Sequence, residues 1–255
     1  MFQKHDSRRN FIRNAAVAAG SALIFTACEQ NSQTANDQPA AGPRKEDEKE
    51  KMGSEEKEVT AAEDLMREHG VLRRALLVYA EAAIRLRRDS NGVPPEALQK
   101  TANLFRTFGE EYHEKKLEEA FIFPVLKQKG GEPAALSDIL IVQHNRGREI
   151  TDYILSVTNA AKIGTNANTL SEILYGFIRM YENHAAREDT VIFPAWKDAI
   201  SDDQYKALNE KFEDIEHEQF GEDGFEDAVK QIGEIETSLG LADISQFTAP
   251  APPAK

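Results

Sequence analysis

The spacing of apolar residues between Ala61 and Gly240 restricts this chain to an all-α fold. Apolar residues recur there at steps of three and four, the period of a helix that buries one face. Short polar breaks, several of them containing glycine or proline, divide the segment. They predict four long helices and then two shorter ones, near residues 61–88, 95–128, 134–161, 169–198, 202–219 and 225–238.

Because the breaks are short, consecutive helices should be antiparallel neighbours. The expected architecture is therefore an up-down-up-down four-helix bundle with two short trailing helices. Ser201 is a good start for the first of these short helices. Its side chain can cap the helix, and the acids Asp202 and Asp203 that follow complement the helix dipole.

Two phrases in the second and fourth helices are nearly the same. One runs from His113 to Pro124 (HEKKLEEAFIFP) and the other from His184 to Pro194 (HAAREDTVIFP). His69 precedes the first phrase by 44 residues, and His144 precedes the second by 40. Two helical pairs related by a pseudo-twofold axis would bring all four histidines to the middle of one core.

Each phrase also carries a glutamate that should face this core. Glu188 follows His184 by four residues, which places both side chains on the same helix face. Counted back from the matching prolines, Glu118 occupies the place of Glu188, but it follows His113 by five residues. A step of five turns a regular helix by about 140° more than one full turn. A single-residue π-bulge would restore a common face, and Glu119 is the alternative carboxylate if the helix is uninterrupted.

This pattern predicts a two-metal site. A buried carboxylate without a partner costs several kcal/mol, and metal ions at Glu118 and Glu188 would remove that cost. Iron, zinc and manganese all accept imidazole and carboxylate ligands. In the alternative interpretation, each histidine is a hydrogen-bonded core residue and the bundle is purely structural.

Further side chains near the repeat receive weaker interpretations. Arg73 and Arg148 each follow a histidine by four residues and could pair with the bridging glutamates, or lie in solvent. Gly147 could leave room for a small molecule beside the metal. His217 lies outside the repeat and is expected at the surface.

The first 28 residues read as a bacterial export signal. Arg8, Arg9 and Arg13 precede an apolar run of roughly 13 residues, too short to span a bilayer. The sequence SRRNFIR resembles a twin-arginine (Tat) motif, and FTAC, ending at Cys28, resembles a lipobox. Cys28, the one cysteine, is therefore the candidate for lipidation, and the expected location is the periplasmic side of a bacterial membrane, with a lipid anchor.

The remaining divisions follow from composition. Residues 29–59 are polar and charged and are expected to form a disordered linker. Residues 60–246 are the metal-binding domain, and residues 247–255 a Pro/Ala-rich disordered tail. The net charge of −13 and the absence of a basic stripe argue against a nucleic-acid partner.

The histidine-containing segments resemble the hemerythrin-like (HHE cation-binding) family over residues 61–245. The resemblance rests on LMREH around His69, YHEK around His113, QH at His144 and HAAREDTVIFP from His184. One histidine per helix is most similar to the diiron branch linked to iron–sulfur cluster repair. Oxygen carriers have a further histidine on the third helix, and Arg148 stands in that place here.

The resemblance implies two iron ions, each held by two of the four histidines and bridged by Glu118 and Glu188, alongside an oxo or hydroxo group. It also implies a small ligand, namely dioxygen, nitric oxide or peroxide. No acid–base pair or nucleophile stands out, so the sequence does not predict an enzyme. The other functional hypotheses are an iron storage, delivery or repair protein without gas chemistry, and a purely structural helical bundle.

Overall fold

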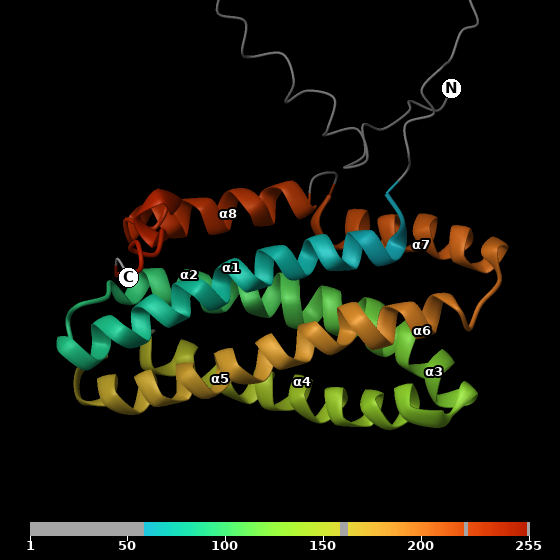
Figure 1. Cartoon of the computed structure of the whole chain (residues 1–255), viewed down its shortest axis with the longest axis horizontal. Coiled ribbons are helices and arrows are strands. Elements are labelled where there is room, and N and C mark those ends of the chain that lie inside the picture. Colours follow the sequence, from blue (N-terminus) through green and yellow to red (C-terminus); the bar gives the residue numbers. More distant parts are fainter. Residues whose placement is uncertain (1–58, 159–162, 222–223, 254–255) are drawn as a thin grey trace, which may run out of the picture. The chain divides into compact units, whose positions relative to one another are not determined.

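The computed structural model describes residues 59–158, 163–221 and 224–253 of the chain. These residues form helices and no strand (Figure 1), which confirms the all-α prediction. None of the described helices is long and apolar enough to cross a membrane. The expected export signal, Cys28 and residues 29–58 of the expected linker lie outside the described residues.

Four helical stretches make up the bundle. They are α1 (Ala61–Arg88); α2, η2 and α3 (Pro95–Leu104, Phe105–Ile122 and Phe123–Lys129); α4 (Gly131–Thr158); and α5, η4 and α6 (Ala167–Arg187, Glu188–Ile192 and Phe193–Lys197). Helices α7 (Asp202–Phe220) and α8 (Gly224–Ser238) follow, and short 3-10 turns lie at Gly164–Asn166 and Ile244–Phe247. These bounds agree with the predicted helices to within three residues wherever the structure describes the chain.

The stretches pack in two pairs. Helix α1 packs along α5, while α2, η2 and α3 pack along α4. Figure 1 shows α1 beside α5, with α7 and α8 on the other side of α1. Helix α8 contacts α1 and α2, and α7 contacts α1 and η2. Ser201 caps α7 as predicted, through a reciprocal hydrogen-bond pair with Gln204.

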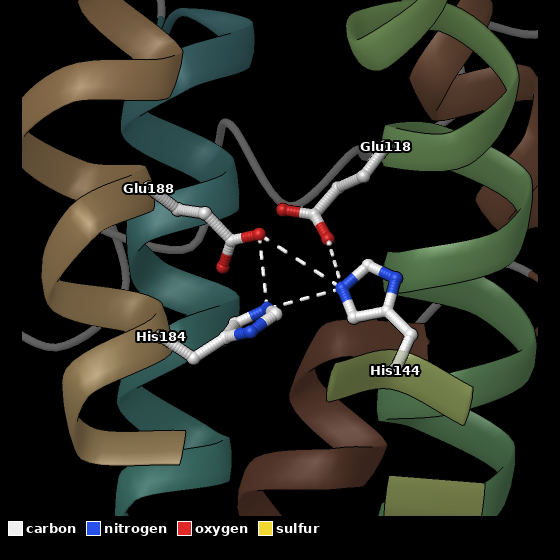
Figure 2. A group of neighbouring side chains, drawn as sticks. All are labelled: Glu118, His144, His184 and Glu188. Atoms are coloured by element: carbon white, nitrogen blue, oxygen red, sulfur yellow. Dashed lines mark hydrogen bonds and ion pairs between the residues drawn. The ribbon is translucent and has the colours of Figure 1, made fainter. Parts of the chain in front are cut away.

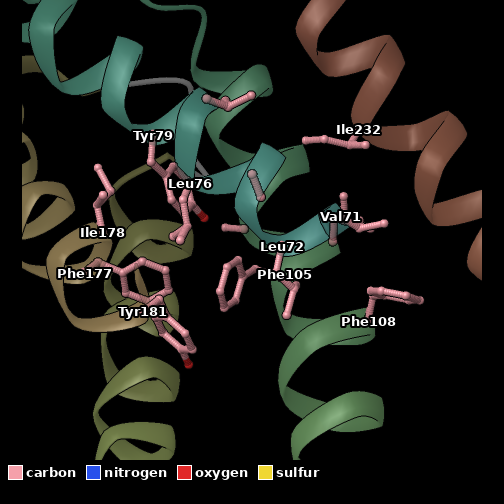
Figure 3. Packing of buried hydrophobic residues seen from close by; sticks show 14 of the residues in the cluster. Val71, Leu72, Leu76, Tyr79, Phe105, Phe108, Phe177, Ile178, Tyr181 and Ile232 are labelled. Carbon is pink, nitrogen blue, oxygen red and sulfur yellow. The ribbon is translucent and has the colours of Figure 1, made fainter. Parts of the chain in front are cut away.

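Aromatic side chains from α1, η2 and α5 pack together in the core (Figure 3). Phe105 of η2 packs edge-on against Phe177 and Tyr181 of α5, with ring centroids 4.9 and 4.8 Å apart. Tyr79 of α1 packs edge-on against Phe177 at 5.6 Å. Such aromatic pairs add to the stability that burial itself provides, so this layer holds α1, η2 and α5 in fixed positions.

Element η2 is an 18-residue π-helix, which is much longer than the single-residue bulge expected from the sequence. Each N–H of a π-helix donates to the carbonyl five residues back, and most π-helices are single turns. One row of buried residues of η2 follows this wider turn, with steps of four and five from Phe105 through Gly109, His113 and Glu118 to Ile122. The π geometry therefore places His113 and Glu118 on one face.

Both copies of the repeated phrase contain π geometry. The N–H of Phe123 donates to the Glu118 carbonyl, and the N–H of Phe193 donates to the Glu188 carbonyl. A proline follows each phenylalanine, and proline has no N–H and clashes with the carbonyl four residues back. The turn before each proline widens accordingly. The sequence interpretation missed the second π segment, which Pro194 signals.

Candidate metal centre

All six residues predicted as metal ligands lie together in the middle of the bundle. His69 comes from α1, His144 from α4 and His184 from α5, while His113 and Glu118 come from η2 and Glu188 begins η4. Each is 3 % exposed or less. The structure thus brings the four helical stretches together at one buried cluster of imidazoles and carboxylates.

The four histidines form two pairs. The Nε2 atoms of His69 and His113 lie 3.0 Å apart, and those of His144 and His184 also lie 3.0 Å apart. The members of each pair come from the two helical stretches joined by one turn. The sequence predicted that the four histidines meet, and the structure shows which of them pair.

The two glutamates connect the histidine pairs. Glu118 directs one oxygen to His113 Nε2 at 3.3 Å and the other to His144 Nε2 at 3.5 Å. Glu188 directs one oxygen to His184 Nε2 at 3.0 Å and the other to His69 Nε2 at 3.4 Å. Figure 2 shows the two carboxylates side by side above His144 and His184. Each histidine pair therefore faces one oxygen from each carboxylate.

Each histidine also makes a hydrogen bond on its outer side. The Nδ1–H groups of His69 and His144 donate to Asp189 at 2.7 Å and to Glu119 at 2.9 Å. Those of His113 and His184 donate to Glu68 at 2.7 Å and to Gln143 at 2.9 Å. Donation from Nδ1 leaves the Nε2 lone pair directed inward, the tautomer that a metal ligand needs.

The sequence interpretation missed these four acceptors, although the repeat contains a signal for them. Glu68 and Gln143 stand directly before His69 and His144, and Glu119 and Asp189 stand directly after Glu118 and Glu188. Glu119 thus contacts the outer nitrogen of His144, whereas Glu118 lies between the histidine pairs. This geometry favours Glu118 as the bridging carboxylate, and its role as a ligand stays a prediction.

Arginines complete the outer layer. Arg73 pairs with Asp189, and Arg148 pairs with Glu119 at 2.6 Å and with Glu114 at 3.1 Å. Of the two alternatives, pairing with the bridging glutamates or solvation, neither describes these contacts fully, since both arginines pair with carboxylates at the rim of the cluster. His144, Glu114 and Glu119 also lie close enough to hold a cation, and Arg148 already supplies one there.

The charges of the cluster are tightly coupled without a metal. Burial disfavours protonation of His113, but the Glu118 and Glu68 carboxylates outweigh it and hold its pKa well above the ordinary value. Burial likewise opposes ionisation of Glu188, and the neighbouring His184 and His69 nevertheless hold its pKa well below its usual range.

The donor set fits two metal ions. All four oxygens of Glu118 and Glu188 are buried and accept no hydrogen bond, which is costly unless another cation satisfies them. His69 and His113 with Glu118 form one group able to hold an ion, and His144 and His184 with both glutamates form another. His217, half-buried on α7, belongs to neither group.

A small cavity of about 10 Å³ adjoins the cluster between α1 and α5. Leu72, Leu76, Tyr181 and Ala185 line it beside the histidines. This volume is close to the smallest that holds one water molecule. The space beside the cluster on this side is therefore about large enough for one water-sized molecule.

The space beside Gly147 is filled, so the expectation of room for a small molecule there was wrong. A Cβ at position 147 would overlap the hydroxyl of Tyr181. That hydroxyl donates to Glu114 at 2.7 Å. The missing side chain at Gly147 thus accommodates the tyrosine of the neighbouring helix.

The family profile of the hemerythrin HHE cation-binding domain matches residues 60–196, which include all six clustered residues. The chain belongs to this family. It is 42 % identical over 243 residues to uncharacterized proteins of Mycobacterium tuberculosis and Mycobacterium bovis, covering 94 % of this chain and 90 % of each relative. No solved structure matches the chain significantly. As a hemerythrin-family protein it is a metal-binding helical bundle, and the buried cluster is its candidate metal site.

Proposed function

We propose that the protein holds two iron ions in this cluster and binds or reacts with dioxygen, nitric oxide or hydrogen peroxide there. The observation that supports this proposal most is the placement of the carboxylates, each with one oxygen toward each histidine pair. His69 and His113 would hold one ion and His144 and His184 the other, with Glu118 and Glu188 bridging them. Bound iron would supply redox chemistry and open coordination positions.

The cavity between α1 and α5 favours a small-molecule function over storage or delivery of iron. It places Leu72, Leu76 and Ala185 beside the histidines, where a metal-handling protein needs no such space. One histidine per helix supports the branch linked to iron–sulfur cluster repair rather than the oxygen carriers. Manganese and zinc accept the same ligands, so the metal itself has to be measured.

Elemental analysis and an optical spectrum of aerobically purified protein test the proposal. We expect two irons per chain and the near-ultraviolet bands of an oxo-bridged diferric centre. Glu118→Ala should lose metal, whereas Glu119→Ala should keep two ions at saturating iron. Two ions in Glu118→Ala together with loss in Glu119→Ala would reverse the assignment of the bridge.

Anaerobic reduction followed by exposure to oxygen or nitric oxide separates gas chemistry from iron storage. The optical bands should change on exposure if the ligand reaches the centre. Bands that never form or never change, in protein that holds two irons, would leave storage or delivery as the function.

We further propose that the protein is exported by a Tat system and anchored by a lipid at Cys28 on the periplasmic side of a bacterial membrane. The twin-arginine sequence and the lipobox-like FTAC support this location. Fractionation of cells that express the wild type and Cys28→Ala tests it. The wild type should sediment with membranes and the variant should not, and equal membrane content in both would exclude the anchor.

A further inference from the structure

The two halves of the site differ on the sides that face away from the glutamates. Residues at matching positions of the repeat are Leu72 and Gly147, Leu76 and Thr151, Glu110 and Tyr181, and Glu114 and Ala185. The cavity on the α1/α5 side is lined by Leu72, Leu76, Ala185 and Tyr181, together with Arg73 and Glu114. Figure 3 shows Leu72, Leu76 and Tyr181. The η2/α4 side carries Glu110, Glu114 and Thr151, all of them buried.

Glu110 is a buried carboxylate of the η2/α4 side and is not one of the proposed ligands. Its side chain is fully buried, and one carboxylate oxygen accepts from the Thr151 hydroxyl at 2.6 Å. The other oxygen lies 3.1 Å from the Arg106 Nε but accepts no well-formed hydrogen bond. Burial of a carboxylate whose oxygen lacks a well-formed hydrogen bond favours the protonated form of the group.

A polar connection joins Glu110 to the surface. Arg106, next to Glu110, also bonds to Asp152 of α4 at 2.5 Å, and the Asp152 side chain is 74 % exposed. Inward from Glu110, one helical turn along η2, Glu114 accepts from Tyr181 and lies 3.9 Å from His144 Nδ1. The cavity between α1 and α5 has Arg73 and Glu114 in its lining besides its apolar side chains.

We propose that Glu110 binds its single proton more tightly when the metal centre gains an electron, so that proton exchange accompanies reduction on the η2/α4 side. This inference rests on the proposed function, because it needs a redox-active centre. One electron comes from an external one-electron donor, and one solvent proton converts the Glu110 carboxylate into a carboxylic acid. Glu110 makes and breaks no bond to metal in this step.

The surroundings of Glu110 suit this role. Tyr79 of α1, Tyr181 of α5, Arg106 and Glu114 of η2, and Arg148 and Asp152 of α4 are the titratable and charged groups that face it. Burial raises the pKa of Glu110 to about 7, although the Thr151 hydroxyl lowers it. Glu110 therefore changes charge near neutral pH, where the protein can use the change.

The coupling to the centre should be measurable. Glu110 precedes Glu118 by eight residues of η2, a separation on the order of 10 Å along a helix. At an effective dielectric of about 20, a unit charge at that distance alters proton affinity roughly tenfold. A tenfold effect on a one-electron equilibrium corresponds to about 59 mV.

The test is a redox titration of the iron-loaded protein from pH 6 to 9, compared with Glu110→Gln. The wild-type midpoint potential should fall by about 59 mV over this range, and Glu110→Gln should lose that fall. Glu111→Gln removes the same charge from the exposed neighbouring residue and should keep the wild-type fall of the midpoint potential. An equal pH dependence in Glu110→Gln and the wild type would overturn the proposal.

Two further measurements keep the test decisive. Infrared spectra of metal-free protein should show a protonated-carboxyl stretch that titrates near neutral pH and is missing in Glu110→Gln; its absence from the wild type contradicts the proposal.

If Glu110→Gln fails to fold, Thr151→Val replaces it. Loss of the Thr151 donor should move the pH window upward, and an unmoved window excludes Glu110. Wild-type protein that binds no redox-active metal would refute the proposed function itself, whatever the infrared result.

Discussion

The hydroxyl of Tyr181 occupies the space that a side chain at position 147 would need. In this position it donates to Glu114, which also pairs with Arg148. A glycine on α4 thereby allows a tyrosine of α5 to complete a buried polar group on η2. The close approach of three helical stretches depends on this one missing Cβ.

Gly147→Ala should therefore destabilise the protein, because Tyr181 has to move and its bond to Glu114 breaks. Overpacking of this kind costs about 1–3 kcal/mol, which chemical denaturation can measure. Gly176→Ala is the matched control, since it lies on α5 with open space around it. It should stabilise the protein by up to about 1 kcal/mol through better helix propensity. Equal effects of the two substitutions would contradict the packing described.

Asp189→Ala and Glu119→Ala should weaken metal binding without removing a ligand. Each change takes away the acceptor that orients an imidazole, His69 in the first case and His144 in the second. Loss of such an acceptor lowers metal affinity about 10–100-fold. Competition with a chelator of known affinity measures the loss, and Glu182→Ala, exposed on α5, should leave affinity unchanged.

Removal of metal should lower the thermal stability of the domain, since it takes the cations away from four buried carboxylate oxygens that accept no hydrogen bond. Metal that binds only the folded state at 100 times its dissociation constant stabilises by about 2.7 kcal/mol per site. Calorimetry of metal-free protein at increasing iron concentration should show a rising midpoint. In Glu188→Ala most of this rise should disappear, and a full rise in that variant would place the metal elsewhere.

The stability of metal-free protein should also depend on Glu110. Its pKa rises from 4.5 to about 7 on folding, so the folded state binds the proton more tightly than the unfolded state. Stability is therefore lost as pH increases from about 4.5 to about 7, by a total on the order of 3 kcal/mol. Denaturation at several pH values should show that the free energy of unfolding of Glu110→Gln increases relative to that of the wild type over this range. The free energy of unfolding of Glu111→Gln should depend on pH as that of the wild type does.

The fold followed from the sequence because helical period and short breaks left few other arrangements. The helix from Ala61 to Arg88 was predicted to the residue. The clustering of His69, His113, His144 and His184 was also foreseeable, since a repeated phrase implies repeated geometry. Glu118 could be placed only by counting back from Pro124, because the five-residue step conflicts with an α-helix.

Other features depended on contacts that no local pattern specifies. The extent of η2 reflects side chains packed at steps of four and five along 18 residues, and a single proline does not reveal that length. The role of Gly147 depended on Tyr181, from another helix. Asp189 and Glu119 were overlooked as imidazole partners because each acts on a histidine of the other half of the repeat.

These crossed hydrogen bonds have a consequence for the order in which the protein is made. The Asp189 carboxylate that orients the His69 ring lies 120 residues later in the chain. When the first two helical stretches have been synthesised, the site is therefore still incomplete. All of the proposed ligands come together only after the fourth stretch has packed against the others. Complete metal binding at this cluster would therefore follow the packing of all four helical stretches.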